Sequence, residues 1–303
     1  MKIGYPCINL TLNCSSSRSF RLKNYSEERL IETIENNLNC LERILKFNYE
    51  NRILFFRITS DLIPFASHPI MKFNWQNYFG SKFEEIGNFI KESHMRITMH
   101  PGQYTVLNSR NSNVLDNSIK ELQYHTEVLD LLKLDSSAKI MTHIGGVYGN
   151  KQESLNRFIK NYEKLDETIK NRYVIENDDR SYDINDCLFV HKNTEIPVIL
   201  DIYHHSCKNS GDSLIDAIEK IIKTWKKKDG LPIFHYSSEH PTKGKCRHAD
   251  KIDINHFKGF IEMIKDYDLD VMLEIKDKER SAIFALNTLR KHRKFQNIPN
   301  LKV

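Results

Sequence analysis

The sequence predicts an α/β protein built as a single (β/α)8 TIM barrel. Three observations support this fold: apolar segments of strand-like pattern recur along the chain, helical periodicity fills the intervals, and the length is 303 residues. Parallel strands need crossover helices, and eight such strands close into a barrel without a free edge. A barrel of this kind commonly takes about 250 residues plus extensions, so we expect residues 1–303 to form one domain.

The strand-like segments span the whole chain. They cover residues 2–7, 52–59, 96–99, 139–143, 172–175, 197–202, 232–236 and 270–275. Helical periodicity is clearest in 27–45, where leucine and isoleucine recur every three or four residues, and it returns in 115–132 and 213–225. An open doubly wound sheet is the alternative, but no GxGxxG motif follows the first strand. We also find no long linker rich in Pro, Gly or Ser that would divide the chain.

Composition indicates a globular protein outside the membrane. The chain is 40% hydrophobic and 28% charged, and no window approaches the roughly 18 apolar residues of a membrane span. The first ten residues, MKIGYPCINL, lack the apolar core of a signal peptide, so we expect a cytoplasmic protein. The six cysteines are scattered without a CxxC motif, which predicts reduced thiols. They are Cys7, Cys14, Cys40, Cys187, Cys207 and Cys246.

The charge balance is mildly basic. The net charge is +5 and the pI is near 8.7, with basic clusters at 226–228 and 290–294. Such clusters permit binding of a polyanion, but taken alone they are more often the solvated faces of helices.

Ligand-type side chains close six successive predicted strands. They are His100, His143, Glu176, Asp201, His235 and Glu274, with His204 just beyond the sixth strand and His248 in the loop after the seventh. A single residue of this kind is more often a hydrogen-bonded histidine, a helix cap or an ion-pair partner. In a barrel, however, the carboxyl ends of all strands meet at one mouth. The recurrence therefore predicts a metal site, whereas His125, His256 and His292 lie in helical segments.

The ligand types favour particular metals and chemistry. Imidazoles with carboxylates favour zinc, manganese or iron, whereas oxygen ligands alone favour magnesium or calcium. Clustered ions bridged by carboxylates deprotonate water and stabilise a leaving alkoxide, which suits phosphodiester hydrolysis. A two-metal sugar isomerase or epimerase uses similar ligands, so spacing alone leaves both reactions open.

Several motifs, in order along almost the whole chain, resemble the UV damage endonuclease family (UvsE or UVDE). They are YPCIN (5–9), SDLIPFASHP (60–69), MHPGQY (99–104), THIGG (142–146), IENDD (175–179), DIYHH (201–205), HYSS (235–238), RHADK (247–251) and LEIKDKE (273–279). This family is a TIM barrel related to apurinic endonucleases of the endonuclease-four type. The resemblance implies a DNA repair enzyme that nicks immediately 5′ to cyclobutane pyrimidine dimers and 6-4 photoproducts, and also cuts abasic sites. The products are a 3′-hydroxyl and a 5′-phosphate.

The resemblance also implies roles for individual residues. Two or three Mn²⁺ ions are expected, with Zn²⁺, Mg²⁺ and Co²⁺ as alternatives, and Glu176 would bridge two of them. The implied ligands are His68, His100, His143, Glu176, Asp201, His204, His235, His248 and Glu274. Glu176, His235 and Glu274 carry the implied catalytic role, and Asp250 would ligate a metal or support His248.

The implied partner is damaged double-stranded DNA. Pro101 and Gly102 end the third strand, so Gln103 and Tyr104 project from a loop. They would fill the gap opposite flipped-out damaged bases, while Tyr5 and Asn9 would contact the lesion. A photoproduct stacks and pairs badly, so flipping it costs less than flipping a normal base. Insertion of a wedge needs only one protein face, and a monomer is therefore expected.

One position departs from the family. Relatives can carry a carboxylated lysine two residues before the strand-seven histidine, where this chain has Ile233. We expect metal binding and cleavage to persist, with a different rate or lesion preference. The alternative functions are an apurinic endonuclease, a sugar isomerase or epimerase indifferent to Tyr104, and a non-catalytic damage-binding protein that would need no complete ligand set.

Overall fold

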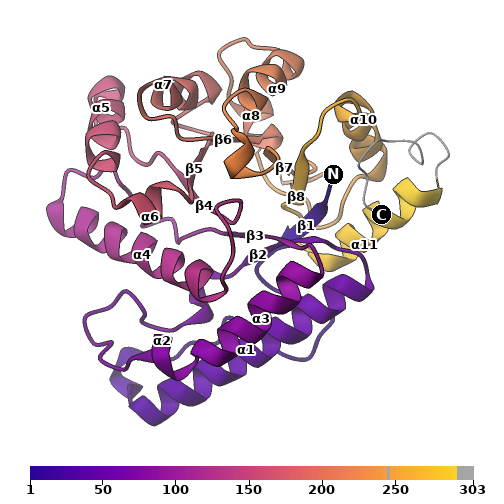
Figure 1. Ribbon diagram of the computed structural model, residues 1–303. Helices are drawn as coiled ribbons and strands as arrows, with labels where there is room; N and C mark the ends of the chain where they lie inside the picture. The colour runs from indigo at the N-terminus through magenta and orange to yellow at the C-terminus, as the bar shows by residue number, and fades with distance from the viewer. Residues whose placement is uncertain (244–245, 292–303) are drawn as a thin grey trace.

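A computed structural model describes residues 1–243 and 246–291 and shows a closed barrel. Its eight strands are parallel and lie in chain order, so the predicted (β/α)8 TIM barrel is confirmed. The strands are β1 (Ile3–Pro6), β2 (Phe55–Ile58), β3 (Arg96–Met99), β4 (Lys139–His143), β5 (Tyr173–Glu176), β6 (Val198–Asp201), β7 (Ile233–Tyr236) and β8 (Asp270–Leu273). Figure 1 shows them at the centre of a ring of helices.

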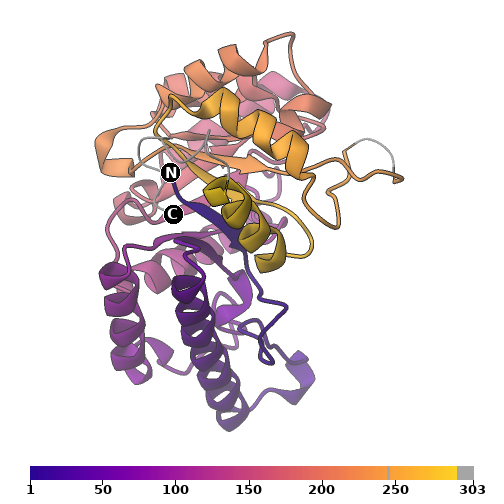
Figure 2. The same ribbon diagram turned by 90° about the vertical axis from the view of Figure 1, so that its right-hand side faces the viewer.

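The helices cover the outside of the barrel. They are α1 (Glu27–Glu50), α2 (Trp75–Tyr78), α3 (Gly80–Glu92), α4 (Ser112–Leu131), α5 (Lys151–Tyr162), α6 (Glu167–Lys170), α7 (Ile184–Thr194), α8 (Ile202–Cys207), α9 (Leu214–Ile222), α10 (Ile254–Ile264) and α11 (Glu279–Lys291). The apolar positions predicted for α1, including Leu30, Ile34 and Leu38, are buried in the hydrophobic core. In Figure 2 residues 237–243 and 246–253, between β7 and α10, extend well beyond the barrel. No helix among residues 1–243 and 246–291 has the length and apolar character to cross a bilayer.

An apolar layer fills the middle of the barrel. It consists of Phe55, Met141, Val174, Ile199, Ile233 and Met272, all fully buried. Alternate residues of a strand face the same side, so the side chain two positions further along each strand lies directly above this layer. Those side chains are Arg57, His143, Glu176, Asp201, His235 and Glu274. The apolar layer therefore supports a polar layer at the carboxyl end of the barrel.

Close packing of β1 against β2 depends on a glycine. A Cβ atom on Gly4 would lie 2.1 Å from the carbonyl oxygen of Phe55. Gly4 pairs with Phe55 in the strand register, so any larger residue would push the two strands apart at the level of the apolar layer.

Buried ion pairs close the amino end of the barrel. Arg96 Nη1 lies 2.8 Å from Asp270 Oδ2, and Lys139 Nζ lies 2.5 Å from Asp229 Oδ1. Arg96 also donates to the carbonyl oxygen of Asp229. These pairs neutralise charges that would otherwise be costly to bury.

Four cysteines form disulfides, so the prediction of reduced thiols is wrong for them. Cys14 pairs with Cys40 and Cys207 with Cys246, with Cα atoms 5.8 and 5.9 Å apart. The partners lie 26 and 39 positions apart in the sequence and meet only because the chain folds. Linear spacing carries no sign of this proximity. Cys7 and Cys187 are free.

Candidate metal centre

Three groups of histidine and carboxylate side chains meet at the carboxyl end of the barrel. Within each group the potential ligand atoms lie within 4.8 Å of one another. The groups are His100, His143 and Glu176; Glu176, Asp201 and His204; and Glu176, His235 and Glu274. Glu176 belongs to all three. The structure thus brings together every predicted ligand except His68 and His248.

Glu176 lies at the centre because β5 ends there. It is 2% exposed, and its Oε1 accepts a hydrogen bond from His235 Nδ1 at 2.6 Å. Burial raises the pKa of this carboxyl, but His235, His143 and His204 outweigh burial and hold the pKa well below its usual range. Glu176 is therefore a carboxylate, the form that bridges metal ions.

Two histidines are oriented by backbone carbonyls. His100 Nδ1 donates to the carbonyl of Pro101 at 2.6 Å, and His204 Nδ1 donates to the carbonyl of Asn177 at 3.0 Å. With Nδ1 protonated, a neutral ring keeps Nε2 unprotonated and available as a ligand. Burial, reinforced by Arg57 and His143, lowers the pKa of His100 to about 4. His100 is thus a neutral imidazole at physiological pH.

Asp201 and Asn177 hold each other in place. The side chain of Asn177 donates to the carbonyl of Asp201 and accepts from its N–H, at 3.0 and 2.9 Å. Asp201 also caps α8 by accepting from the N–H of His204 at 2.7 Å. The predicted sixth strand therefore ends at Asp201, where this cap starts a helix. Asn177 was missed in the sequence because an amide beside a predicted ligand resembles any loop asparagine.

Unpaired polar atoms support binding of a cation here. His143 Nδ1 and Asp201 Oδ2 are buried without a hydrogen-bond partner, and Asp201 Oδ2 lies 3.5 Å from His204 Nδ1. Buried polar atoms are nearly always paired, and each exception calls for an unseen partner. Burial raises the pKa of Asp201, while Asp201 and Glu176 overcome burial to raise the pKa of His204 to about 9. The pair therefore retains a proton that a metal ion would displace, and the residues fit a divalent metal.

Arg57 is a charged member of the centre that the sequence prediction missed. Its Nη2 lies 2.8 Å from Glu274 Oε1 and donates to His235 Nε2 at 3.0 Å. Burial raises the pKa of Glu274, but Arg57 and His235 outweigh it and lower the pKa to about 2. A signal was available, because Arg57 interrupts the apolar segment FFRI at the level where the other strands carry ligands.

Comparison with known proteins identifies the family. The family model described as UV-endonuclease UvdE matches residues 1–303. The chain belongs to the UvdE family. A UV DNA damage endonuclease from Clostridium perfringens is 44% identical over 299 residues, which is 98% of this chain and 73% of that protein. The crystal structure of SacUVDE superposes with a TM-score of 0.92 at 43% identity, covering 96% of this chain and 98% of the other.

The family resemblance inferred from the motifs is therefore confirmed. This UvdE-family chain is a DNA repair endonuclease. Endonuclease IV from Thermus thermophilus has a TM-score of 0.58 at 12% identity, covering 96% of this chain and 98% of the other. That likeness shows the fold alone.

His248 lies next to the centre of this UvdE-family chain but outside the three groups. Its ring centroid is 6.0 Å from that of His204, and burial lowers its pKa. Its Nδ1 is buried and unpaired. The Cys207–Cys246 disulfide ties the loop of His248 to the end of α8, which carries His204.

Two other predicted metal residues lie away from the groups. His68 is exposed, and its Nδ1 accepts from the N–H of Ile70 at 3.1 Å. Asp250 is 61% exposed and pairs with Lys276 at 2.8 Å and His240 at 3.2 Å. Asp250 therefore supports His240 and not His248, contrary to prediction, because its loop turns the carboxylate outward.

The predicted DNA contacts differ in accessibility. Tyr104 is 82% exposed, and Gln103 beside it is also exposed. Tyr5 is fully buried, and its hydroxyl donates to Asn48 at 2.8 Å and accepts from Asn9 at 2.9 Å. Tyr5 and Asn9 are thus placed in a buried hydrogen-bonded group and not on an accessible surface.

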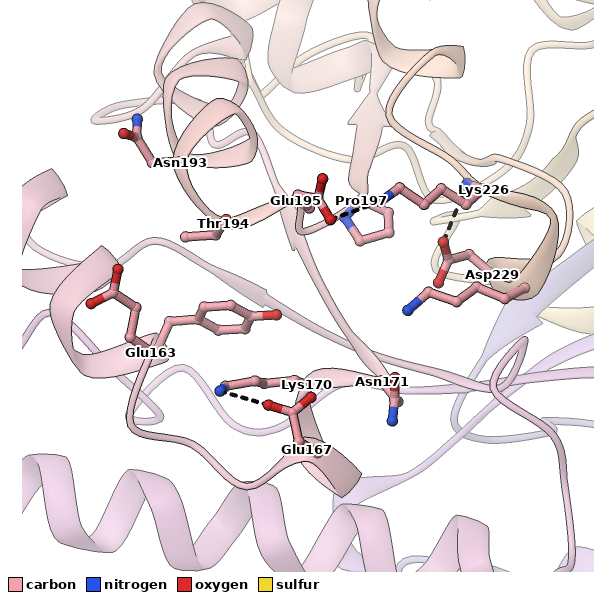
Figure 3. Close-up of a pocket in the computed structure, with 12 residues that line it drawn as sticks. Glu163, Glu167, Lys170, Asn171, Asn193, Thr194, Glu195, Pro197, Lys226 and Asp229 are labelled. Carbon is pink, nitrogen blue, oxygen red and sulfur yellow. Dashed lines mark hydrogen bonds and ion pairs between the residues drawn. The ribbon is translucent and has the colours of Figure 1, made fainter.

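The lysines at 226–228 lie at the opposite end of the barrel. They precede β7, and two of them border a pocket shown in Figure 3, together with Glu195 and Asp229. Lys226 Nζ pairs with Glu195 at 2.8 Å. This cluster is therefore remote from the ligand groups. Of the cluster at 290–294, residues 292–294 lie outside the described part of the chain, as does His292.

Proposed function

We propose that this chain nicks double-stranded DNA immediately 5′ to UV photoproducts in a metal-dependent reaction. The substrates are cyclobutane pyrimidine dimers, 6-4 photoproducts and abasic sites, and the products are a 3′-hydroxyl and a 5′-phosphate. The observation that carries this proposal is the position of Glu176, a carboxylate common to three ligand groups. We further propose that the chain acts as a cytoplasmic monomer.

The residues divide the work in this proposal. The three groups would hold two or three Mn²⁺ ions, which supply a deprotonated water and neutralise charge on the phosphodiester. His100 presents an unprotonated nitrogen and His143 an unpaired buried nitrogen, while His204 would give up its proton to a bound metal ion. Arg57 keeps Glu274 ionised, so this carboxylate remains available as a ligand.

Tyr104 and Gln103 supply the contact with the lesion in this proposal. Their exposure leaves both side chains free to enter a duplex. The aromatic ring of Tyr104 can stack on the bases opposite the damage, and such stacking does not depend on sequence. Selectivity then comes from the low cost of unstacking a damaged pair.

Cleavage of end-labelled duplexes tests the proposal. Duplexes with one thymine dimer, one abasic site or no damage are incubated with Mn²⁺ or EDTA, and the cut is mapped to a single nucleotide. We expect a Mn²⁺-dependent nick just 5′ to the dimer. Cleavage at the abasic site alone would assign the chain to apurinic endonuclease chemistry, and an intact dimer duplex would contradict the proposal.

A further inference from the structure

The turn between β8 and α11 holds Lys278 beside the metal centre. Glu279 anchors this turn, because its carboxylate accepts from the N–H of Leu10 at 2.9 Å and from the hydroxyl of Thr11 at 2.8 Å. Lys278 itself has a φ of 54°, a left-handed conformation that is uncommon for a residue other than glycine. The backbone of Lys278 is thus fixed between β8 and the loop that follows β1.

Buried cations elsewhere in the barrel each have a carboxylate partner. Arg57 pairs with Glu274 at 2.8 Å, Arg96 with Asp270 at 2.8 Å, and Lys139 with Asp229 at 2.5 Å. Arg172 pairs with Asp130 at 2.7 Å. These pairs follow the general rule that a charge is removed from water only when another charge compensates it.

Lys278 departs from this pattern. It is half-buried, and among the described residues no carboxylate oxygen lies within the 4.0 Å of an ion pair with it. Burial lowers the pKa of Lys278, and the carboxylates of Glu274 and Glu279 offset that effect only in part. An ammonium group is therefore held in a partly desolvated position without a counter-ion in direct contact.

The neighbouring groups cannot supply that counter-ion. Burial raises the pKa of the Cys7 thiol, so Cys7 is neutral at physiological pH. Glu274 is engaged by Arg57, and Glu279 is engaged by Leu10 and Thr11. A counter-ion in direct contact with Lys278 would then come from outside the chain.

We propose that Lys278 binds a backbone phosphate of the DNA strand that is cut, beside the metal centre. This inference rests on the proposed function, since it assigns one anionic group of the same substrate. Lys278 lies in the turn that follows the carboxyl end of β8, which is the end of the barrel that carries the ligand groups. A phosphate oxygen would satisfy the ammonium and restore the charge balance found at the other buried cations.

Lys276 offers a matched control in the same turn. It is 50% exposed and pairs with Asp250 at 2.8 Å, so its charge already has a partner. The two lysines are two positions apart in the sequence and carry the same ammonium group. A difference between Lys276→Met and Lys278→Met therefore reports on the environment of the charge.

The test is binding of a fluorescent duplex with one thymine dimer to the Mn²⁺-loaded chain, measured by anisotropy at several salt concentrations. We expect Lys278→Met to weaken binding about tenfold or more and to lower the slope of log K against log salt by about one. Lys278→Arg should retain most of the binding. Lys276→Met should bind like the wild type.

Stability and metal content distinguish a binding role from a structural one. Removal of an uncompensated charge should leave the thermal midpoint of Lys278→Met unchanged or raised, with the Mn²⁺ content unchanged. Equal binding and equal salt slopes for the two methionine variants would overturn the inference, as would a lower midpoint with loss of metal. Failure of the proposed function is a separate observation, because there the wild type would bind without nicking.

Discussion

Arg57 on β2 and Glu274 after β8 form an ion pair of 2.8 Å inside the mouth of the barrel. Both side chains are largely buried, at 7% and 20% exposure. The arginine compensates the charge of a carboxylate that burial alone would tend to protonate. The ion pair therefore keeps Glu274 in the ionised form that can bind a metal ion.

Arg57→Met should weaken metal binding, most strongly at acid pH. Without the guanidinium, burial would raise the pKa of Glu274 from about 2, so the carboxylate would be lost at a higher pH. We expect a loss of roughly 10–100-fold in Mn²⁺ affinity, the usual effect of removing a group that supports a ligand. Calorimetric titration with Mn²⁺ between pH 5 and 8 measures this affinity. Arg57→Lys should recover part of the affinity, and equal affinities at all pH values would refute this role.

Glu176→Gln should abolish organised metal binding, because one carboxylate serves three ligand groups. We expect more than about 100-fold loss of nicking, above the range for supporting residues. Metal content by mass spectrometry and rates on the thymine-dimer duplex measure the effect. Glu163→Gln, in the pocket at the far end of the barrel, is the control. A fully loaded Glu176→Gln variant would contradict the shared role.

Tyr104→Ala should impair lesion cleavage without affecting folding. The side chain is 82% exposed, so its removal should change the free energy of unfolding by less than about 0.5 kcal/mol. Loss of base stacking is worth about 1–3 kcal/mol, or roughly 5- to 150-fold in affinity. Steady-state cleavage of the dimer duplex and urea unfolding test the two parts. Unchanged cleavage would exclude Tyr104 from lesion recognition.

His125→Gln should make folding less sensitive to acid. Burial lowers the pKa of His125 to about 4, although its Nδ1 bonds the Glu121 carbonyl and Asp61 opposes the effect. The unfolded chain takes up this proton near pH 6.5, so stability is full above that pH and falls as pH drops toward 4. At pH 5 this proton uptake lowers the free energy of unfolding by about 2 kcal/mol. Urea unfolding at pH 7 and 5 measures this loss of stability, with His94→Gln, at an exposed position, as the control. Equal losses in the wild type, His125→Gln and His94→Gln would refute the role of His125.

The sequence was sufficient for features that depend on local pattern. Strand ends carrying His100, His143 and Glu176 could be predicted because a barrel directs all its strand ends to one mouth. The disulfide partners could not, since Cys207 and Cys246 meet only through the closed fold. The sequence also does not show which side chains are buried, which is why Tyr5 was expected to contact DNA. Its hydroxyl instead bonds Asn48, a residue on a helix distant in the sequence.

The apolar layer divides the barrel into two ends whose polar side chains have separate partners. Asp270 at the amino end of β8 and Glu274, just after its carboxyl end, are four positions apart, or about 13 Å in an extended chain. Substitutions at this separation without shared partners usually have additive effects. The heat tolerance of this enzyme can therefore be adjusted through the ion pairs of Asp270 and Asp229, while its turnover is adjusted independently through residues at the mouth.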